Sequence, residues 1–389
     1  MKRIHMLAAL AFFTPLACSN PGDICSDSPL TPACLVDLSV DVTVDDEPAE
    51  GIPVSASGPS LASESTGSDG TVTFSGLEAG VYLVTVDDPE VTWDQAQITL
   101  NIPARQQGSA SFSGSRRIGR IAFSSDRSGT YQVYSIRPDG SDERRLTTDG
   151  FSDRGPSWSP DGARLAFHSD RAGGGDDIWI MNADGSNPER LTTTPSSQYP
   201  GWTRGPGRVT YASDHGGNLD IYTVNPNGSE AQQITTDPAR EQAPSWSPSG
   251  DRVAFQSDRA DPGTFEVYSI GTQGGGATPL TNTGSRNITP RYSPDGSRIA
   301  FASERDGAGI LEIYVMNADG SSPERVTFEN ARSTSPSWSP DGTRIAFQSD
   351  GGGDFEIYVV DLNSGAVEQI TDNTDEDVEP TWGPPVAND

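Results

Sequence analysis

One motif recurs six times between residues 118 and 382, and its spacing limits the fold more than any other feature of the chain. Each copy carries an aromatic residue at one landmark position: Trp158, Trp202, Trp246, Tyr292, Trp338 and Trp382. Successive landmarks are 44, 44, 46, 46 and 44 residues apart. A period in this range, made of short strands and tight turns, is typical of an all-β propeller in which each repeat forms one blade.

The fifth copy shows how a repeat divides into four strands. Residues 334–338 form a short first strand, and the Ser-Pro-Asp-Gly turn at 339–342 supplies proline and glycine where their φ angles are needed. Residues 344–348, 355–360 and 367–371 have the length and composition of three further strands. Four short strands are what one propeller blade requires.

The two ends of the repeat array complement each other. The first copy begins at Arg120 with a second strand and lacks the turn and aromatic residue that precede it elsewhere. The last copy ends with an orphan first strand, Glu379–Trp382. Pairing these two strands would join the ends of the ring and remove its exposed edges. We therefore predict a six-bladed propeller with three-plus-one closure.

The repeats resemble those of TolB-type, WD-like propellers of the periplasm. The resemblance rests on Ser-Pro-Asp-Gly at 159–162, 293–296 and 339–342, on Ser-Asp-Arg at 125–127, 169–171 and 257–259, and on Met-Asn-Ala-Asp-Gly at 181–185 and 316–320. It assigns residues 114–389 to the propeller, although residues 204–207 and 274–276 depart from the pattern. The resemblance implies that ligands bind at the channel mouth and the adjoining loops. Nothing in the chain resembles the α/β domain of TolB itself, so TolB's own partners do not simply carry over.

Residues 35–113 have a sequence pattern that differs from that of the repeats. Apolar and polar residues alternate along 38–44, 71–74 and 82–86, with turn-rich stretches between them, which predicts a small β-sandwich. The run from Thr66 to Tyr82 resembles carboxypeptidase regulatory-like, transthyretin-type modules, and the resemblance implies a spacer or adhesion module. The polar stretch 105–117 is expected to be the linker to the propeller.

The N-terminus predicts export. A basic start precedes the apolar run Met6–Phe13, and Ala17-Cys18 resembles a bacterial lipobox, so residues 1–17 are expected to be a lipoprotein signal peptide. Residues 18–34 would then form a linker that starts at a lipidated Cys18 and contains a disulfide between Cys25 and Cys34. The alternative is an ordinary cleaved signal with one thiol left over. Because no Asp follows the cysteine, the outer membrane is favoured, at its periplasmic face or the cell surface.

The composition excludes some partners. The net charge is −29, from 26 basic and 55 acidic residues, which disfavours nucleic acid and anionic membrane surfaces. We expect a monomer whose only membrane attachment is its lipid.

Catalytic groups are scarce. Removal of the signal would leave only His168 and His215, and both occupy positions where sister repeats carry other residues. No cysteine or histidine pair has zinc-ligand spacing. The acids that follow the loop serine in every repeat favour a structural role, because a short carboxylate can accept backbone N–H bonds and hold a loop. We therefore expect no enzyme and no cofactor.

The residues that differ between blades are better site candidates. Those on the predicted partner-binding face are Asp153, Arg154, Gln198, Tyr199, Glu241, Gln242, Asn287, Arg291, Thr334, Asp377 and Glu379. A carboxylate cluster on the same rim could hold calcium through Asp372, Asp375, Asp377 and Glu379, since Ca²⁺ takes several oxygen ligands. The alternative for each of these residues is an ordinary solvated loop.

Two functions fit these features. The first is a non-enzymatic exported lipoprotein whose propeller is a protein- or peptide-binding scaffold in the cell envelope. The second is a carbohydrate-active propeller, glycan-binding or a lyase, that uses the central channel.

Overall fold

The computed structural model describes residues 35–44, 47–88, 91–104, 106–116, 119–194, 196–203, 207–272, 275–307, 309–328 and 331–385. The predicted signal peptide and linker, with Cys18, Cys25 and Cys34, lie outside this range. The chain divides into two units, Met1–Arg117 and Ile118–Asp389. Within the described residues, no helix has the length and apolar character needed to cross a membrane.

The first unit contains two sheets. The five-stranded sheet consists of β1 (Leu35–Val44), β2 (Glu47–Pro48), β5 (Thr71–Glu78), β7 (Val91–Trp93) and β9 (Gln107–Arg116). The four-stranded sheet consists of β3 (Pro53–Ser57), β4 (Leu61–Ser65), β6 (Gly80–Val86) and β8 (Gln97–Ile102). Alternate residues of β1 and β6 point inward, and both sheets contribute to a single apolar core.

The predicted linker at 105–117 is wrong for most of its length. Strand β9 covers this segment and runs parallel to β1, from the pair Asp37 and Gln107 to the pair Val44 and Gly114. The first unit therefore extends past the predicted boundary at residue 113. Apolar and polar residues alternate only weakly in this segment, so no strand was predicted there.

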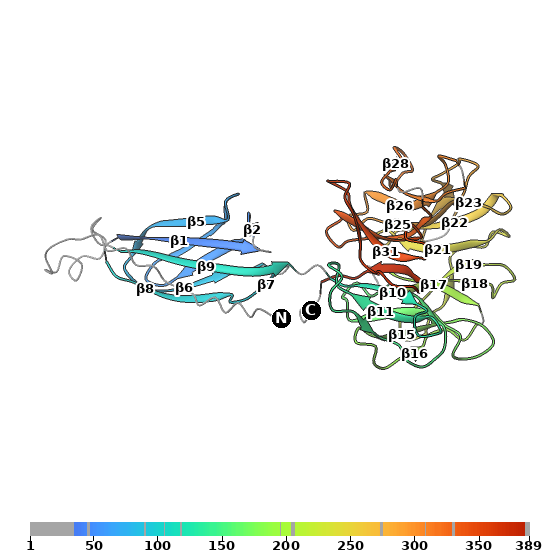
Figure 1. The fold of residues 1–389 in the computed structure, drawn as a ribbon, viewed down its shortest axis with the longest axis horizontal. Coiled ribbons are helices and arrows are strands. Elements are labelled where there is room, and N and C mark those ends of the chain that lie inside the picture. The colour runs from blue at the N-terminus through green and yellow to red at the C-terminus, as the bar shows by residue number, and fades with distance from the viewer. Residues whose placement is uncertain are drawn as a thin grey trace. The chain divides into compact units, whose positions relative to one another are not determined.

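The second unit contains six four-stranded antiparallel sheets (Figure 1). Five of them follow the chain in order: β13 (Asp153–Trp158), β14 (Arg164–Ser169), β15 (Asp177–Asn182) and β16 (Glu189–Arg190); β17 (Ser197–Trp202), β18 (Val209–Ser213), β19 (Asp220–Val224) and β20 (Gln232–Gln233); β21 (Glu241–Trp246), β22 (Arg252–Asp261), β23 (Thr264–Gly271) and β24 (Thr278–Pro279); β25 (Asn287–Tyr292), β26 (Arg298–Ser303), β27 (Glu312–Asn317) and β28 (Glu324–Arg325); β29 (Ser333–Trp338), β30 (Arg344–Ser349), β31 (Glu356–Asp361) and β32 (Val367–Gln369). This arrangement is that of propeller blades.

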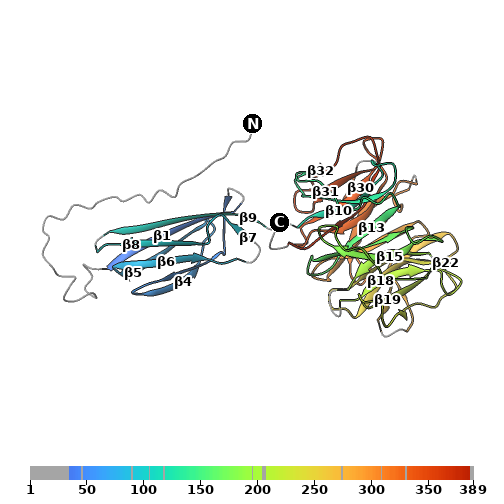
Figure 2. The same cartoon turned by 90° about the horizontal axis from the view of Figure 1, so that it is seen from below.

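The sixth sheet joins the two ends of the repeat array. It contains β10 (Ile121–Ser125), β11 (Gln132–Ile136), β12 (Arg144–Arg145) and the C-terminal β33 (Asp377–Trp382). Strand β33 pairs with β10, with Trp382 opposite Ile121 and Asp377 opposite Ser125, as the repeats predict. Figures 1 and 2 both show the C-terminal strands beside β10, and β33 also contacts the first strands β29 and β13.

Two repeated features build each blade. The second strand is buried on both faces, and its phenylalanine is completely buried in five copies: Phe123, Phe167, Phe255, Phe301 and Phe347. The threonine after the fourth strand accepts a bond from the third strand's backbone N–H, at 2.8–3.0 Å in all six copies: Thr147, Thr192, Thr235, Thr281, Thr327 and Thr371. This repeated threonine thus fixes the outermost strand to the blade.

Deleting residues 378–389 should strongly destabilise the second unit. The deletion removes most of β33, including the nearly buried Trp382, and leaves β10 with an open edge. Loss of a buried tryptophan alone costs about 3–5 kcal/mol, a large share of a typical domain stability. Urea unfolding should show a clearly lower midpoint, or the truncated chain should aggregate. Coincident unfolding curves for the full and truncated chains would show that β33 contributes nothing to stability.

Candidate functional site

Every first strand contains a bulge at the same position. In each, a proline follows a residue with positive φ, and the register against the second strand shifts at that point. The positive-φ residues are Gly155 (58°), Tyr199 (53°), Ala243 (51°), Thr289 (51°), Ser335 (54°) and Glu379 (57°). Proline has no N–H for the ladder, so a bulge is the arrangement that tolerates it inside a sheet. The repeated proline was the sequence signal for this feature.

The bulge turns a backbone N–H out of the sheet toward the preceding blade. In three blades, a side chain on the preceding second strand accepts this bond. The pairs are Gly155 with Ser124 (3.0 Å), Thr289 with Gln256 (2.9 Å) and Glu379 with Gln348 (2.7 Å). The first strands are thereby linked to their neighbours at one level of the blades, near the loops that lead into the first strands. We call this level the channel mouth.

Glu379 is the only charged residue among the six positive-φ residues. Its Oε2 accepts hydrogen bonds from the Gly155 N–H at 2.9 Å and from the Ser124 hydroxyl at 3.2 Å. The Arg154 Nε lies 3.5 Å from the same oxygen, and the Arg154 guanidinium stacks over the Tyr131 ring at 4.1 Å. The arrangement of the six bulges is otherwise repeated, but it includes an ion pair between Arg154 and Glu379 at the mouth. This pair lies where β33 meets β13.

His168 and Tyr199 lie beside this pair. The His168 ring packs against Gly155, where an added Cβ would lie 3.0 Å from its Nδ1, and lies 6.3 Å from the Tyr199 ring. Burial lowers the pKa of His168, although the Glu379 carboxylate acts in the opposite direction, so the imidazole is neutral at pH 7. Burial raises the pKa of Tyr199, and Glu379 adds to that rise.

Three buried polar atoms around the mouth have no hydrogen-bond partner among the described residues. They are the His168 Nδ1, the Arg154 Nε and the Thr289 Oγ1. Buried polar groups are nearly always satisfied, and exceptions gather where a protein binds water or ligand. The mouth therefore offers donors and an acceptor that the described parts of the fold leave unused.

Four of the predicted face residues do not form a surface. Asp153, Glu241, Asn287 and Asp377 are completely buried at the start of their strands. Each contacts an arginine two residues past the repeated serine of the second strand: Arg171 with Asp153 (2.7 Å), Arg127 with Asp377 (2.6 Å), Arg305 with Asn287 (3.3 Å), and Arg259, still within β22, with Glu241. They hold these loops, and a partner cannot reach them. The residue type at this position varies between blades because Asp, Glu and Asn can all contact the arginine. This variation predicted a partner-binding surface, and for these four residues that prediction was wrong.

The remaining predicted residues divide between the mouth and other places. Arg154, Tyr199 and Glu379 come together as described, and Gln198 bonds Asp176 at 2.6 Å on the same rim. The other three lie apart from this cluster. Gln242 accepts a bond from Gln256 at 3.0 Å, Thr334 is nearly buried, and Arg291 lies deeper along its strand.

The structure does not assemble the predicted calcium ligands. Asp377 faces Arg127 and the Asn373 amide, whereas Glu379 faces Gly155. Asp375 donates its N–H to the Asn373 side chain, and Asp372 joins no ligand group. Among the described residues, no three acidic, histidine or cysteine side chains are grouped to hold a metal ion. Closeness in sequence misled here: Asp377 and Glu379 would share a face in a regular strand, but the bulge at Glu379 turns their side chains apart.

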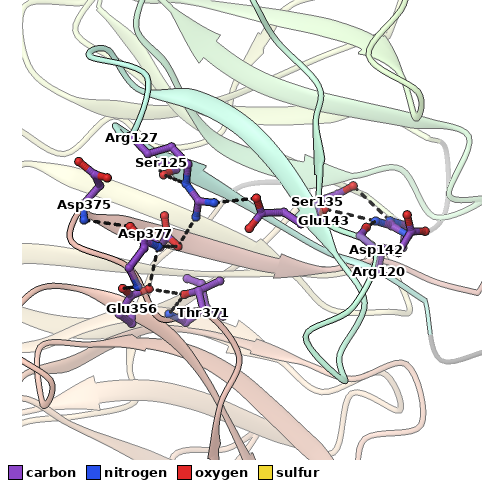
Figure 3. A network of polar contacts seen from close by, with 12 residues as sticks. Arg120, Ser125, Arg127, Ser135, Asp142, Glu143, Glu356, Thr371, Asp375 and Asp377 are labelled. Carbon is purple, nitrogen blue, oxygen red and sulfur yellow. Dashed lines mark hydrogen bonds and ion pairs between the residues drawn. The ribbon is translucent and has the colours of Figure 1, made fainter. Parts of the chain in front are cut away.

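A buried polar network lies where β33 joins the first sheet (Figure 3). Arg127 bonds Asp377, and Asp377 accepts a bond from Asn373 at 2.9 Å. The Glu356 carboxylate accepts bonds from the Thr371 hydroxyl and from the Asn373 N–H. Burial, with the nearby Asp377 carboxylate, raises the pKa of Glu356 to about 7.

This raised pKa predicts that Glu356 weakens the fold as the pH rises. The folded state binds the proton more tightly than the unfolded state, so the contribution of this carboxyl group is most favourable below pH 4.5 and is lost as the pH rises toward 7. Replacing Glu356 by Gln removes the titration. Melting temperatures should show the variant gaining on the wild type between pH 5 and pH 8, whereas Glu368→Gln on the exposed β32 should show a constant difference. A Glu356→Gln difference that is flat with pH would contradict the shift.

Comparison with known proteins agrees with this geometry. The family described as "TolB beta propeller domain" matches residues 72–205, 196–291 and 280–387, and its first match begins inside the first unit. Comparison with curated proteins gave no match.

Among solved structures, the chain is similar to TolB from Acinetobacter baumannii, at 19% identity and a TM-score of 0.61, covering 79% of this chain and 80% of that one. It is similar to a putative TolB from Agrobacterium tumefaciens, at 24% identity and a TM-score of 0.55, over 66% and 90% of the two chains. A third similarity is to hydrazine synthase of Kuenenia stuttgartiensis, at 18% identity and a TM-score of 0.56, over 68% and 46%. At these identities the structures share the fold alone, whereas the family match spans most of the sequence: the chain belongs to the TolB β-propeller domain family.

Proposed function

We propose that this chain is a non-enzymatic exported lipoprotein whose propeller binds a protein or peptide at the channel mouth. The observation that carries the proposal is the single asymmetric cluster on a repeated scaffold, made by Arg154, Glu379, His168 and Tyr199. The His168 Nδ1 has no hydrogen bond, and the Arg154 Nε has only its ion pair with Glu379, so among the described residues the cluster keeps hydrogen-bonding capacity for a ligand. A peptide presents donors and acceptors in close alternation, which suits such a mixed cluster.

The absence of catalysis is part of the proposal. General-base catalysis needs a base within hydrogen-bond reach of the group it deprotonates. Among the described residues, the His168 Nδ1 has no hydroxyl partner, and the nearby Ser124 hydroxyl is directed to Glu379. A carbohydrate-active channel has no comparable observation in its favour.

The rest of the chain would hold the propeller in the cell envelope, with the channel mouth available to a partner. We propose a closed six-bladed ring, with the first unit as a β-sandwich spacer of the carboxypeptidase regulatory-like type. The single core shared by its two sheets supports this role. The proposed Cys18 lipid would attach the spacer to the outer membrane, with a Cys25–Cys34 disulfide near the anchor.

The test is capture of a partner from envelope extract by the immobilised full chain. A partner enriched by the wild type should be lost with the double variant Arg154→Ala, Tyr199→Ala, because these residues supply the exposed part of the cluster. Arg137→Ala is the matched control, since it removes a similar charge from a turn at the opposite end of a blade. Quantitative mass spectrometry of the bound fractions gives the measurement.

Three outcomes would count against the proposal. One is equal capture by the wild type and the double variant, and another is the absence of any enriched protein. Reproducible turnover in a screen of polysaccharide substrates would replace it with the carbohydrate-active alternative.

A further inference from the structure

Arg291 occupies a position where the other five first strands carry small residues. It pairs with Ala300 in the register between β25 and β26. The equivalent residues, in the same register, are Ser157, Gly201, Ser245, Ser337 and Thr381. One long cationic side chain therefore extends into space that the small residues leave open at this level.

Arg291 lines a pocket of about 140 Å³ near the Ser-Pro-Asp-Gly end of the first strands. Besides Arg291 the pocket is lined by Trp246, Pro248, Tyr292, Ser293, Pro294, Ser337, Trp338 and Trp382. These residues belong to four sheets, and β33 is separated from β25 by β29. A pocket that spans non-adjacent blades lies on the side where the first strands face one another, within the channel.

The guanidinium in this pocket has no ionic partner among the described residues. Its Nη1 lies 3.3 Å from the Pro290 carbonyl oxygen and 3.5 Å from that of Pro244, which are marginal hydrogen bonds. Burial lowers the pKa of Arg291 to about 10, with the distant Glu379 acting in the opposite direction, so the group stays charged at pH 7. Arg291 is partly buried, and a charge withdrawn from water without an ionic partner is costly to a fold; here it sits in a chain of net charge −29.

We propose that this pocket binds a carboxylate, carried by the C-terminal end of a peptide or by a free short aliphatic acid. A guanidinium matches a carboxylate with two parallel hydrogen bonds. A dianionic phosphate would need further cations or a cradle of backbone N–H groups, and Arg291 is the only basic residue that lines this pocket. The narrow space between indole and proline side chains suits a slim aliphatic stem behind the carboxylate.

The pocket lies toward the opposite end of the first strands from the mouth cluster, so the inference does not depend on the proposed function. The serine found in three sister blades suggests the variant Arg291→Ser, which removes the cation and keeps a side chain that the position already accepts. Arg291→Lys keeps the charge but loses the planar fork. Arg137→Ser, in the turn after β11 and outside both proposed sites, is the control.

The experiment titrates the full chain with N-acetyl-trialanine, its C-terminal amide, butyrate and inorganic phosphate. Tryptophan fluorescence and calorimetry report binding, because three tryptophans line the pocket. The free carboxylate should bind saturably, and the amide and the Arg291→Ser variant should bind at least about tenfold more weakly, since charge-assisted hydrogen bonds are lost. Arg291→Lys should be intermediate, and Arg137→Ser should match the wild type. Butyrate binding as tightly as the peptide identifies a free-acid site, and binding of the peptide alone identifies a chain-end site.

Other results would overturn the inference. These are equal binding of acid and amide, unchanged binding by Arg291→Ser, phosphate binding as tightly as the acid, or no saturable binding of any carboxylate. A thermal melt tests for a structural role of Arg291: without ligand, Arg291→Ser should melt no lower than the wild type, because it removes a partly buried charge that has no ionic partner among the described residues. A large loss of stability would show that the two carbonyl contacts make Arg291 a structural cation.

Discussion

The antiparallel pairing of β33 with β10 is the interaction on which the rest of the second unit depends. Without it, the first sheet would lack its first strand and β10 would present an open edge. The same pairing brings Glu379 beside Gly155 and Arg154, which are separated from it by more than half of the chain. Pairing of β33 with β10 therefore also assembles the mouth cluster. A chain in which β33 does not pair with β10 would lose both stability and the proposed site.

The repeats also explain why polar residues alone are a poor guide to a site in this fold. Four blades need an acceptor for the arginine that follows the second-strand serine, and four place a buried acid beside the threonine that fixes the outer strand. Buried acids such as Asp153 and Glu356 fill these positions and have strong partners. The residues that depart from the repeat are more informative. Glu379 is charged where its five counterparts are not, and Arg291 is long where its counterparts are small.

Much of the architecture could be predicted from the sequence, because it depends on local patterns. The spacing of the landmark aromatic residues predicted the repeat length, and the turn residues predicted where strands begin and end. The unpaired first strand at Glu379–Trp382 predicted the pairing with β10. The site was predicted less well. A strand's first residue can point into the blade or into the channel, and the bulge before each proline changes that direction within two residues. Asp377 and Glu379 illustrate this: two residues apart, one is buried against Arg127 and the other faces Gly155.

The electrostatics of the channel follow from the same asymmetry. Burial raises the pKa of Tyr199 and lowers the pKa of Arg291, and the Glu379 carboxylate acts on both groups by raising their pKa. An anion bound at Arg291 would therefore meet attraction from the guanidinium and repulsion from Glu379. Both interactions act in a space enclosed by protein, where screening by salt is weaker than at the surface. A ligand with a carboxylate at one end and N–H donors toward Glu379 would satisfy both groups, whereas a compact dianion would face the repulsion uncompensated. The opposing charges of Arg291 on β25 and Glu379 on β33, two first strands separated by β29, thus favour a polar chain end over a simple inorganic anion.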